Sequence, residues 1–203
     1  MNDQIEQAVQ NLKAGDEDQI RQALVGLTAS AFGFAKKVCG NEEDAEDIAQ
    51  ETMIQFTQVF DNFSDPRGLG VWLYKVAKTR CLMSRRNSKF APAHTLSLDQ
   101  LMPSSEETSA LAEKPWRVSP EELVLRKELR AELERAILSL PERYRQVLVL
   151  RDMEELDTEE VAEVLGISPA TVKMRLHRAR AHVRNQLGNY FGSVSDARRA
   201  RDR

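Results

Sequence analysis

The sequence predicts an all-α protein with two small helical domains, joined by a long flexible linker and ending in a C-terminal helix-turn-helix. Strong helix formers recur in long runs, whereas glycine and proline number only 9 and 7 in 203 residues. Apolar residues return every three or four positions, and no segment alternates β-branched with polar residues. One proline-rich stretch interrupts this pattern, so we expect a single long connection between two helical units.

Residues 1–86 are the predicted N-terminal domain. Its first helix should end at Gly15, its second should run from the cap Asp16 to Gly40, and its third should start at the cap Asn41. Residues 61–70 contain one proline and two glycines, which predicts a loop before a fourth helix that starts at Val71.

Residues 87–120 are the predicted linker. Four prolines and a cluster of Ser and Thr remove the helical pattern there, and the stretch is too long for an ordinary connection within a compact domain. Its scattered apolar residues favour a segment threaded over a partner, with disorder as the alternative.

Residues 121–192 are the predicted C-terminal domain. A long helix should break at Leu140–Pro141, and a second should cover residues 142–151. Thr158 is the predicted N-cap of a short third helix, which Gly166 ends. Ser168 caps the next helix, and Pro169 suits its first position.

The last of these helices has a buried and a basic face. Apolar residues recur at positions 172, 176, 179, 183 and 187, which predicts a buried row. The other faces carry Lys and Arg, and a helix of this kind after a glycine turn is typical of a unit that enters the DNA major groove. The alternative is an ordinary helical hairpin with a solvated basic face.

Charge is sorted along the chain, although the net charge is only −3. Residues 152–163 hold seven carboxylates and no basic residue, whereas residues 169–203 hold nine Lys or Arg and two Asp. Local sign governs the encounter with phosphate, so the C-terminal region remains a candidate for DNA binding. Residues 193–203 are predicted to be a basic, disordered tail.

Several functional classes find no support. The chain has no nucleophile–base constellation, glycine-rich phosphate loop or His/Cys cluster, so we expect neither enzymatic activity nor a cofactor nor a metal site. Cys39 and Cys81 are predicted to be core thiols of a reducing cytoplasm, with a redox pair as the alternative. No signal peptide and no apolar run of about 20 residues is present, which predicts a cytoplasmic protein without a membrane span.

Three segments carry a family resemblance. Residues 14–24 with 41–56, residues 71–86 and residues 140–180 look like the successive conserved regions of bacterial sigma factors of the extracytoplasmic-function type. The resemblance covers nearly the whole chain. It implies a dissociable subunit of RNA polymerase that binds the core enzyme, recognises and helps to melt promoter DNA, and is often held by an anti-sigma factor.

The resemblance assigns three sets of residues. A carboxylate and amide face would bind the core polymerase, where charge complementarity steers docking; it comprises Asp44, Asp47, Gln50 and Glu51. The loop and fourth helix would bind and melt the downstream (−10) element with aromatic and basic side chains; this set comprises Asn62, Phe63, Trp72, Lys75, Lys78, Arg80, Arg85 and Arg86. The last helix would read the upstream (−35) element; this set comprises Thr171, Lys173, Met174, Arg175, His177, Arg178 and Arg180.

Alternatives remain for each set. The acidic face could be merely solvated, Trp72 fits a core position better than a DNA contact, and the basic residues could also be solvated. Arg143, Arg145 and Arg151 would either add phosphate contacts or pair with the acidic block. The competing function is a stand-alone helix-turn-helix transcriptional regulator, which would bind a two-fold-symmetric operator without polymerase.

Overall fold

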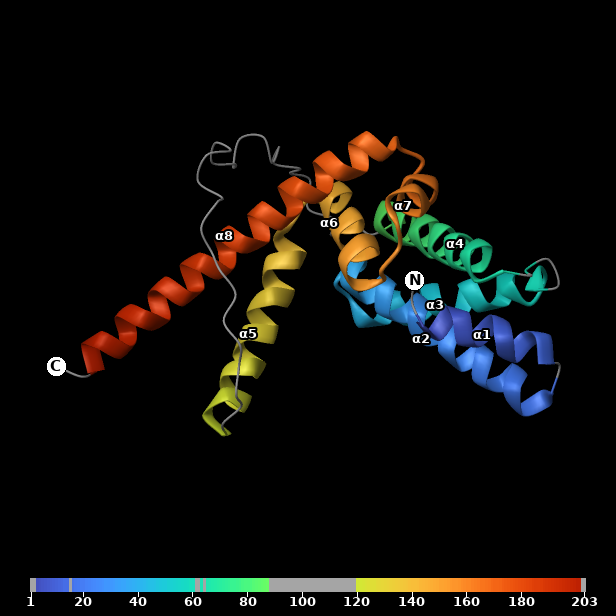
Figure 1. Cartoon of the computed structure of the whole chain (residues 1–203), viewed down its shortest axis with the longest axis horizontal. Helices are drawn as coiled ribbons and strands as arrows, with labels where there is room; N and C mark the ends of the chain where they lie inside the picture. Colours follow the sequence, from blue (N-terminus) through green and yellow to red (C-terminus); the bar gives the residue numbers. More distant parts are fainter. Residues whose placement is uncertain (1–2, 15, 61–62, 64, 88–119, 202–203) are drawn as a thin grey trace.

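A computed structural model describes residues 3–14, 16–60, 63, 65–87 and 120–201, and within these ranges it contains helices and no strand. Figure 1 shows a compact body to which a splayed pair of long helices is attached. None of the described helices is long and apolar enough to cross a membrane. The all-α prediction is confirmed for this part of the chain.

The N-terminal body consists of α1 (Asp3–Ala14), α2 (Glu17–Cys39), α3 (Glu42–Phe56) and α4 (Pro66–Asn87). α2 lies at its centre and contacts each of the other three helices. The rings of Phe34 and Tyr74 meet edge to face at 5.3 Å in its core, a favoured aromatic arrangement. The predicted end of α2 and start of α3 are confirmed, since Gly40 is the left-handed C-cap of α2 and the Asn41 side chain accepts a hydrogen bond from the Glu43 amide. Asp16 stands at the N-cap position of α2 as predicted, but its side chain makes no capping hydrogen bond.

The start of α4 was predicted wrongly. The helix begins at Pro66, not at Val71, so the second half of the expected loop, residues 66–70, is helical. The Asp65 carboxylate accepts a 2.8 Å hydrogen bond from the Gly68 amide and satisfies a donor at the helix start. Pro66 then occupies the first helical position, where its missing N–H costs nothing.

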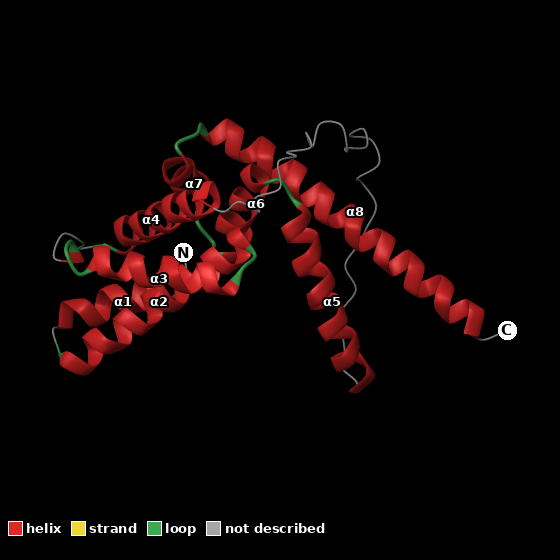
Figure 2. Ribbon diagram, turned by 180° about the vertical axis from the view of Figure 1, so that it is seen from behind, coloured by secondary structure: helices red, strands yellow, loops and turns green. Residues whose placement is uncertain are grey.

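The C-terminal helices are α5 (Pro120–Ser139), α6 (Glu142–Leu148), the π-helical turn η3 (Val149–Met153), α7 (Thr158–Leu165) and α8 (Pro169–Arg201). The break at Leu140–Pro141 is confirmed, but the expected helix over 142–151 changes to π geometry at Val149. The backbone of α8 runs past residue 193 to Arg201, where a disordered tail was expected. Figure 2 shows α5 and α8 diverging from their crossing point near α6.

The N- and C-terminal helices also contact one another. α7 lies against α4, and α2 touches α5, α6 and η3. Gly40 sits at this junction with φ +77°, and a Cβ added there would lie 2.9 Å from a Leu138 methyl group. The glycine is therefore required by backbone conformation and by close approach. The expected linker falls almost wholly on residues 88–119, outside the described residues.

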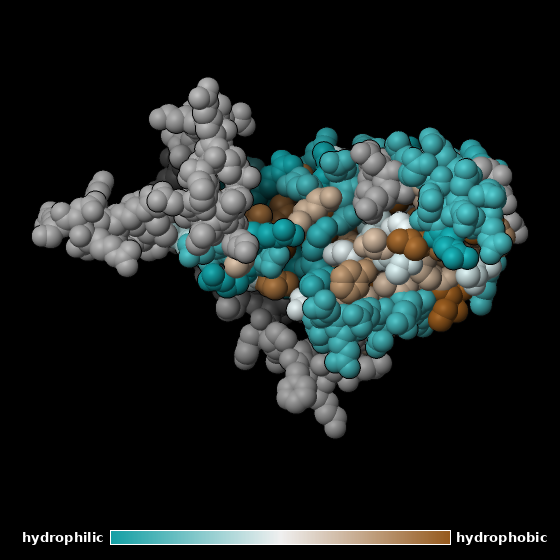
Figure 3. All heavy atoms as spheres, turned by 90° about the horizontal axis from the view of Figure 1, so that it is seen from below, coloured by the Kyte–Doolittle hydropathy of each residue, from teal (hydrophilic) through white to brown (hydrophobic). Residues whose placement is uncertain are grey.

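The surface is mostly polar, with apolar exceptions. The face in Figure 3 has hydrophilic edges and an interrupted apolar strip. Among described residues, the most exposed large apolar side chains are Val25 and Ile54. Ile54 lies on the acidic face of α3, among charged neighbours.

Candidate nucleic-acid interface

The helix-turn-helix is capped at each end. Asp157, the residue before the predicted cap Thr158, accepts a 2.7 Å hydrogen bond from the Glu160 amide, and the Glu160 carboxylate accepts one from the Asp157 amide. This capping box corrects the predicted start by one position. The other predictions hold, since Gly166 ends α7 in the left-handed conformation and the Ser168 hydroxyl accepts from the Thr171 amide.

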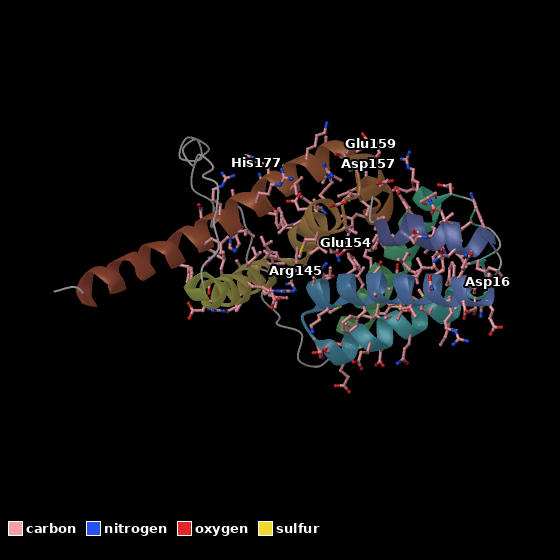
Figure 4. The ribbon with its side chains drawn as sticks, turned by 60° about the horizontal axis from the view of Figure 1, so that its bottom comes forward. Asp16, Arg145, Glu154, Asp157, Glu159 and His177 are labelled. Carbon is pink, nitrogen blue, oxygen red and sulfur yellow. The ribbon has the colours of Figure 1, made fainter. Side chains whose placement is uncertain are left out.

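The N-terminal half of α8 separates an apolar from a polar face. Val172, Leu176 and Ala179 are buried, as the predicted row requires. The opposite face exposes Lys173, Met174 and His177, while Thr171, Arg175 and Arg178 are half-buried. His177 lies on the outward side of α8, remote from the N-terminal body (Figure 4). These exposed and half-buried side chains form what we call the α8 reading face: Thr171, Lys173, Met174, Arg175, His177 and Arg178.

Arg180 is paired within the protein. Its guanidinium donates to both carboxylate oxygens of Asp152, at 2.8 and 2.5 Å. The hydrogen bonds to Asp152 raise the pKa of Arg180 further above its ordinary value, against the effect of partial burial. A DNA phosphate would have to compete with Asp152 for this side chain.

Arg143, Arg145 and Arg151 were predicted either to contact phosphate or to pair with the acidic block of residues 152–163. Arg145 is only 6% exposed, and it donates to the Val38 carbonyl oxygen at 2.7 Å and to the Leu140 carbonyl oxygen at 2.9 Å. Arg151 donates to the Leu156 carbonyl oxygen at 2.6 Å. Both side chains satisfy backbone acceptors, and Arg151 does so within the acidic block, through a carbonyl oxygen and not through a carboxylate. Arg143 lies over the ring of Tyr144, 4.9 Å from its centroid.

The predicted downstream set falls on α4 and the residues before it. Phe56, Phe63 and Trp72 form an aromatic cluster with ring centroids 5.4 to 6.3 Å apart. Trp72 is therefore half-buried among aromatic side chains, which agrees with the alternative that it is a core residue. Lys75 is exposed, whereas Lys78 and Arg80 are half-buried. Asn62 lies outside the described residues. The backbone of α4 places Arg85 and Arg86 in its last turns, but their side chains are outside the described set.

Lys78 and Arg80 both have protein partners. The Lys78 ammonium donates a 2.9 Å hydrogen bond to the Val164 carbonyl oxygen of α7. Burial lowers the pKa of Lys78 below its ordinary value, and the nearby charge of Lys75 lowers it further. Arg80 forms a salt bridge with Glu51, which belongs to the predicted polymerase-binding set.

The predicted core-binding residues share one face of α3. Asp47, Gln50 and Glu51 are exposed and Asp44 is half-buried. Ile54 continues the row at helical spacing, and its side chain is 62% exposed. Sequence reasoning missed Ile54, since only charged and amide residues were considered for this face. We call this row the α3 face: Asp44, Asp47, Gln50, Glu51 and Ile54.

Sequence reasoning also missed Glu154. It is 3% exposed, and its carboxylate accepts 2.7 Å hydrogen bonds from the Lys37 ammonium of α2 and from the Tyr74 hydroxyl of α4. Figure 4 shows Arg145 and Glu154 at the junction between the C-terminal helices and α2. A buried carboxylate needs such partners, so the contact between the two halves is specific. The described residues contain no group of His, Cys, Asp and Glu that could hold a metal ion.

One histidine gives a pH prediction. The His182 imidazole lies between α8 and α5, with Nε2 2.9 Å from the Ser139 hydroxyl oxygen, and burial lowers its pKa below the ordinary value of about 6.5. The unfolded chain therefore binds this proton more readily, and the stability contributed by the neutral ring is present above about pH 6.5 and lost as the pH falls. We expect His182→Gln to lose less unfolding free energy than the parent protein between pH 7 and pH 5, measured by urea denaturation. His177→Gln, at an exposed position of the same helix, is the control; equal losses in the two variants would contradict this role of His182.

Comparisons with known proteins identify the family of the chain. Residues 29–90 match the family Sigma-70 region 2, and residues 130–183 match Sigma-70, region 4. The chain is 31% identical over 186 residues to the ECF RNA polymerase sigma factor SigW of Bacillus subtilis (strain 168), across 90% of this chain and 96% of that relative. It is 30% identical over 183 residues to the ECF RNA polymerase sigma-E factor of Escherichia coli (strain K12), across 88% and 92% of the two chains.

Solved structures share the fold. CnrH in complex with the cytosolic domain of CnrY matches with a TM-score of 0.55 at 23% identity, over 92% of this chain and 96% of that one. The sigma factor RpoE in complex with the anti-sigma factor NepR from Bartonella quintana matches with a TM-score of 0.57 at 20% identity, over 83% and 96%. With the regions matched in order and relatives aligned over nearly their full length, the chain belongs to the ECF family of RNA polymerase sigma factors.

Proposed function

We propose that the chain binds RNA polymerase core and directs it to promoters, with each step assigned to a separate surface. The supporting observation is the order of the two sigma-70 regions: the first contains the α3 and α4 candidate surfaces, and the second contains the candidate surface on α8. The domain division that goes with this proposal is residues 1–86 for core binding and melting and 121–192 for the upstream element. Polymerisation chemistry belongs to the core enzyme, and the chain itself acts by recognition.

The α3 face is the proposed site for the polymerase core. The carboxylates of Asp47 and Glu51 are exposed and would attract a basic partner, which accelerates encounter more than it adds affinity. Ile54 supplies an apolar anchor at the C-terminal end of the charged row, and such anchors carry much of the binding energy in protein interfaces. The combination fits a helical partner with basic residues around an apolar stripe.

The α4 helix is the proposed reader of the downstream element. Lys75 offers an exposed cation, and the Phe63–Trp72 pair offers an aromatic wall beside it. Single-stranded DNA is held by this combination of stacking and phosphate attraction. An anti-sigma factor is a further proposed partner. The similar structure of RpoE is a complex with the anti-sigma factor NepR, and that of CnrH is a complex with the cytosolic domain of CnrY.

The α8 reading face is the proposed reader of the upstream element. We expect Lys173→Ala to weaken binding to that element about tenfold, because one good base contact is worth roughly 1–3 kcal/mol. Arg130→Ala, which removes the same charge from an exposed site on α5, is the control and should leave promoter binding unchanged. Holoenzyme binding to labelled promoter DNA measures the effect. Equal affinities for the two variants would exclude Lys173 from the contact.

Run-off transcription with purified core polymerase tests the function as a whole. A randomised promoter library should yield transcripts that depend on the chain, and their start sites should reveal two conserved elements. A chain that ignores the core enzyme and binds a palindrome by itself would instead be the stand-alone regulator.

A further inference from the structure

Helix α7 contacts two basic side chains of α4, Lys78 and Arg67. The Lys78 ammonium donates to the Val164 carbonyl oxygen at 2.9 Å, and Arg67 Nε lies 3.6 Å from a Glu160 carboxylate oxygen. Figures 1 and 2 both show α7 beside α4. The helix proposed to read the downstream element is therefore already in contact with the other half of the chain.

An α7 carboxylate also reaches the hollow beside the proposed DNA-binding residues. This hollow of about 390 Å³ is lined by Trp72 and Lys75 of α4 and by Glu163 of α7. The carboxylate of Glu163 brings negative charge to the place where a DNA phosphate would meet Lys75. With Glu160 beside Arg67, α7 presents two acids to the basic start of α4.

Buried polar contacts also join the halves, beside the apolar packing that continues from the N-terminal body into the C-terminal helices. Glu154 accepts from Lys37 and Tyr74, and Arg145 donates to the Val38 carbonyl oxygen. Buried polar contacts give specificity but little net stability, because desolvation offsets most of their attraction. Contacts of this kind between domains resemble transient interfaces, which open when a stronger partner competes.

The distance between promoter elements requires the halves to separate. Elements centred at −35 and −10 lie about 25 base pairs apart, or roughly 85 Å along B-DNA. In the structure α7 contacts both α4 and α8, so the two proposed readers are separated by a single helix. Residues 88–119 connect the halves, and a chain of that length spans at most about 110 Å, which is enough for both elements to be reached.

We propose that α7 is an internal competitor of promoter DNA, which covers α4 with acidic side chains in the free chain and leaves when single-stranded DNA binds. This inference depends on the proposed role of α4 in reading the downstream element. In the free chain, the contact of α7 with α4 holds the two halves together. Binding to polymerase and promoter requires the halves to separate.

Glu163→Lys tests the competition between α7 and DNA without disturbing the hydrophobic core, because Glu163 is exposed. The new ammonium would repel Arg67 and Lys75 and loosen α7. The matched control is Glu134→Lys on α5, which makes the same change in net charge at an exposed site. The probe is a fluorescein-labelled random-sequence single-stranded DNA 12-mer at 50 mM salt, followed by anisotropy.

We expect Glu163→Lys to bind this probe about fivefold more tightly than Glu134→Lys. Hydrogen exchange of the parent protein should also rise in η3 and α7 peptides when the DNA is added, because displaced contacts lose protection. Tyr74→Phe, which removes the hydroxyl contact to Glu154, should show faster exchange in the same peptides without DNA.

The outcomes separate the inference from the proposed function. In one outcome, Lys75→Ala weakens DNA binding, but Glu163→Lys binds as Glu134→Lys does and hydrogen exchange in α7 stays constant. DNA would then bind α4 without competition from α7, which overturns the inference but not the proposed function. Failure of every form to bind the probe, Glu163→Lys included, also overturns it, since an uncovered α4 should attract phosphate. If Lys75→Ala changes neither DNA binding nor promoter melting by the holoenzyme, the role of α4 fails and the inference fails with it.

Discussion

Replacing Arg145 with alanine is expected to lower the free energy of unfolding by about 3 kcal/mol. The guanidinium is buried and donates to the carbonyl oxygens of Val38 and Leu140. Its removal leaves both acceptors without their charged donor, and a buried unsatisfied group costs about 1–3 kcal/mol. The Val38 oxygen lies at the end of α2, so the loss also weakens the contact between the two halves of the chain.

Arg143→Ala is the matched control for this experiment. Arg143 lies on the same helix but is exposed, and its contact with the Tyr144 ring is worth about 0.5–1 kcal/mol. Urea denaturation followed by circular dichroism would compare the two midpoints. A midpoint for Arg145→Ala equal to that of Arg143→Ala would show that the buried hydrogen bonds add no stability.

Reversing the charge of Asp47 is expected to weaken binding to the polymerase core by about tenfold or more. Asp47→Lys places an ammonium at the centre of the α3 face, and like charges across an interface slow encounter and cost several kcal/mol at close contact. Asp47 is exposed at the surface of α3, so the fold should be unaffected. Titration of labelled core enzyme with the variant measures the dissociation constant.

Asp18→Lys controls for net charge in the core-binding experiment. It makes the same substitution at an exposed position in the first turn of α2, away from the α3 face. Core affinity should match that of the parent protein, and the affinity of Asp47→Lys for the upstream element alone should stay the same. Equal core affinities for the two variants would remove the α3 face from the polymerase interface.

Helix ends could be predicted where the signal is local. Gly40, Asn41, Gly166 and Ser168 each mark an end through their own backbone or side chain, and the structure confirms all four. The start of α4 was missed because Gly68 and Gly70 suggest a loop, while the Asp65 cap and the proline after it favour a helix. A glycine is tolerated within a helix when capping and packing compensate for its entropy cost.

Contacts between distant segments could not be predicted from periodicity. Glu154 looked like one of many acids before α7, yet its partner Lys37 is 117 residues away in sequence. Arg145 looked like a surface cation, and its acceptor on Val38 is 107 residues away. The π-helical turn that precedes Glu154 also has no simple sequence signature, because the pattern of buried residues continues through it.

The ion pair between Glu51 and Arg80 connects the two proposed binding surfaces of the N-terminal body. A polymerase helix that engages Glu51 draws this carboxylate away, and the guanidinium of Arg80 is then released for a phosphate. Linkage requires the reverse effect to be equal, so a DNA strand that engages Arg80 strengthens the attraction of Glu51 for the enzyme by the same factor. Under this assignment, enzyme and promoter each make the other a better ligand for the chain.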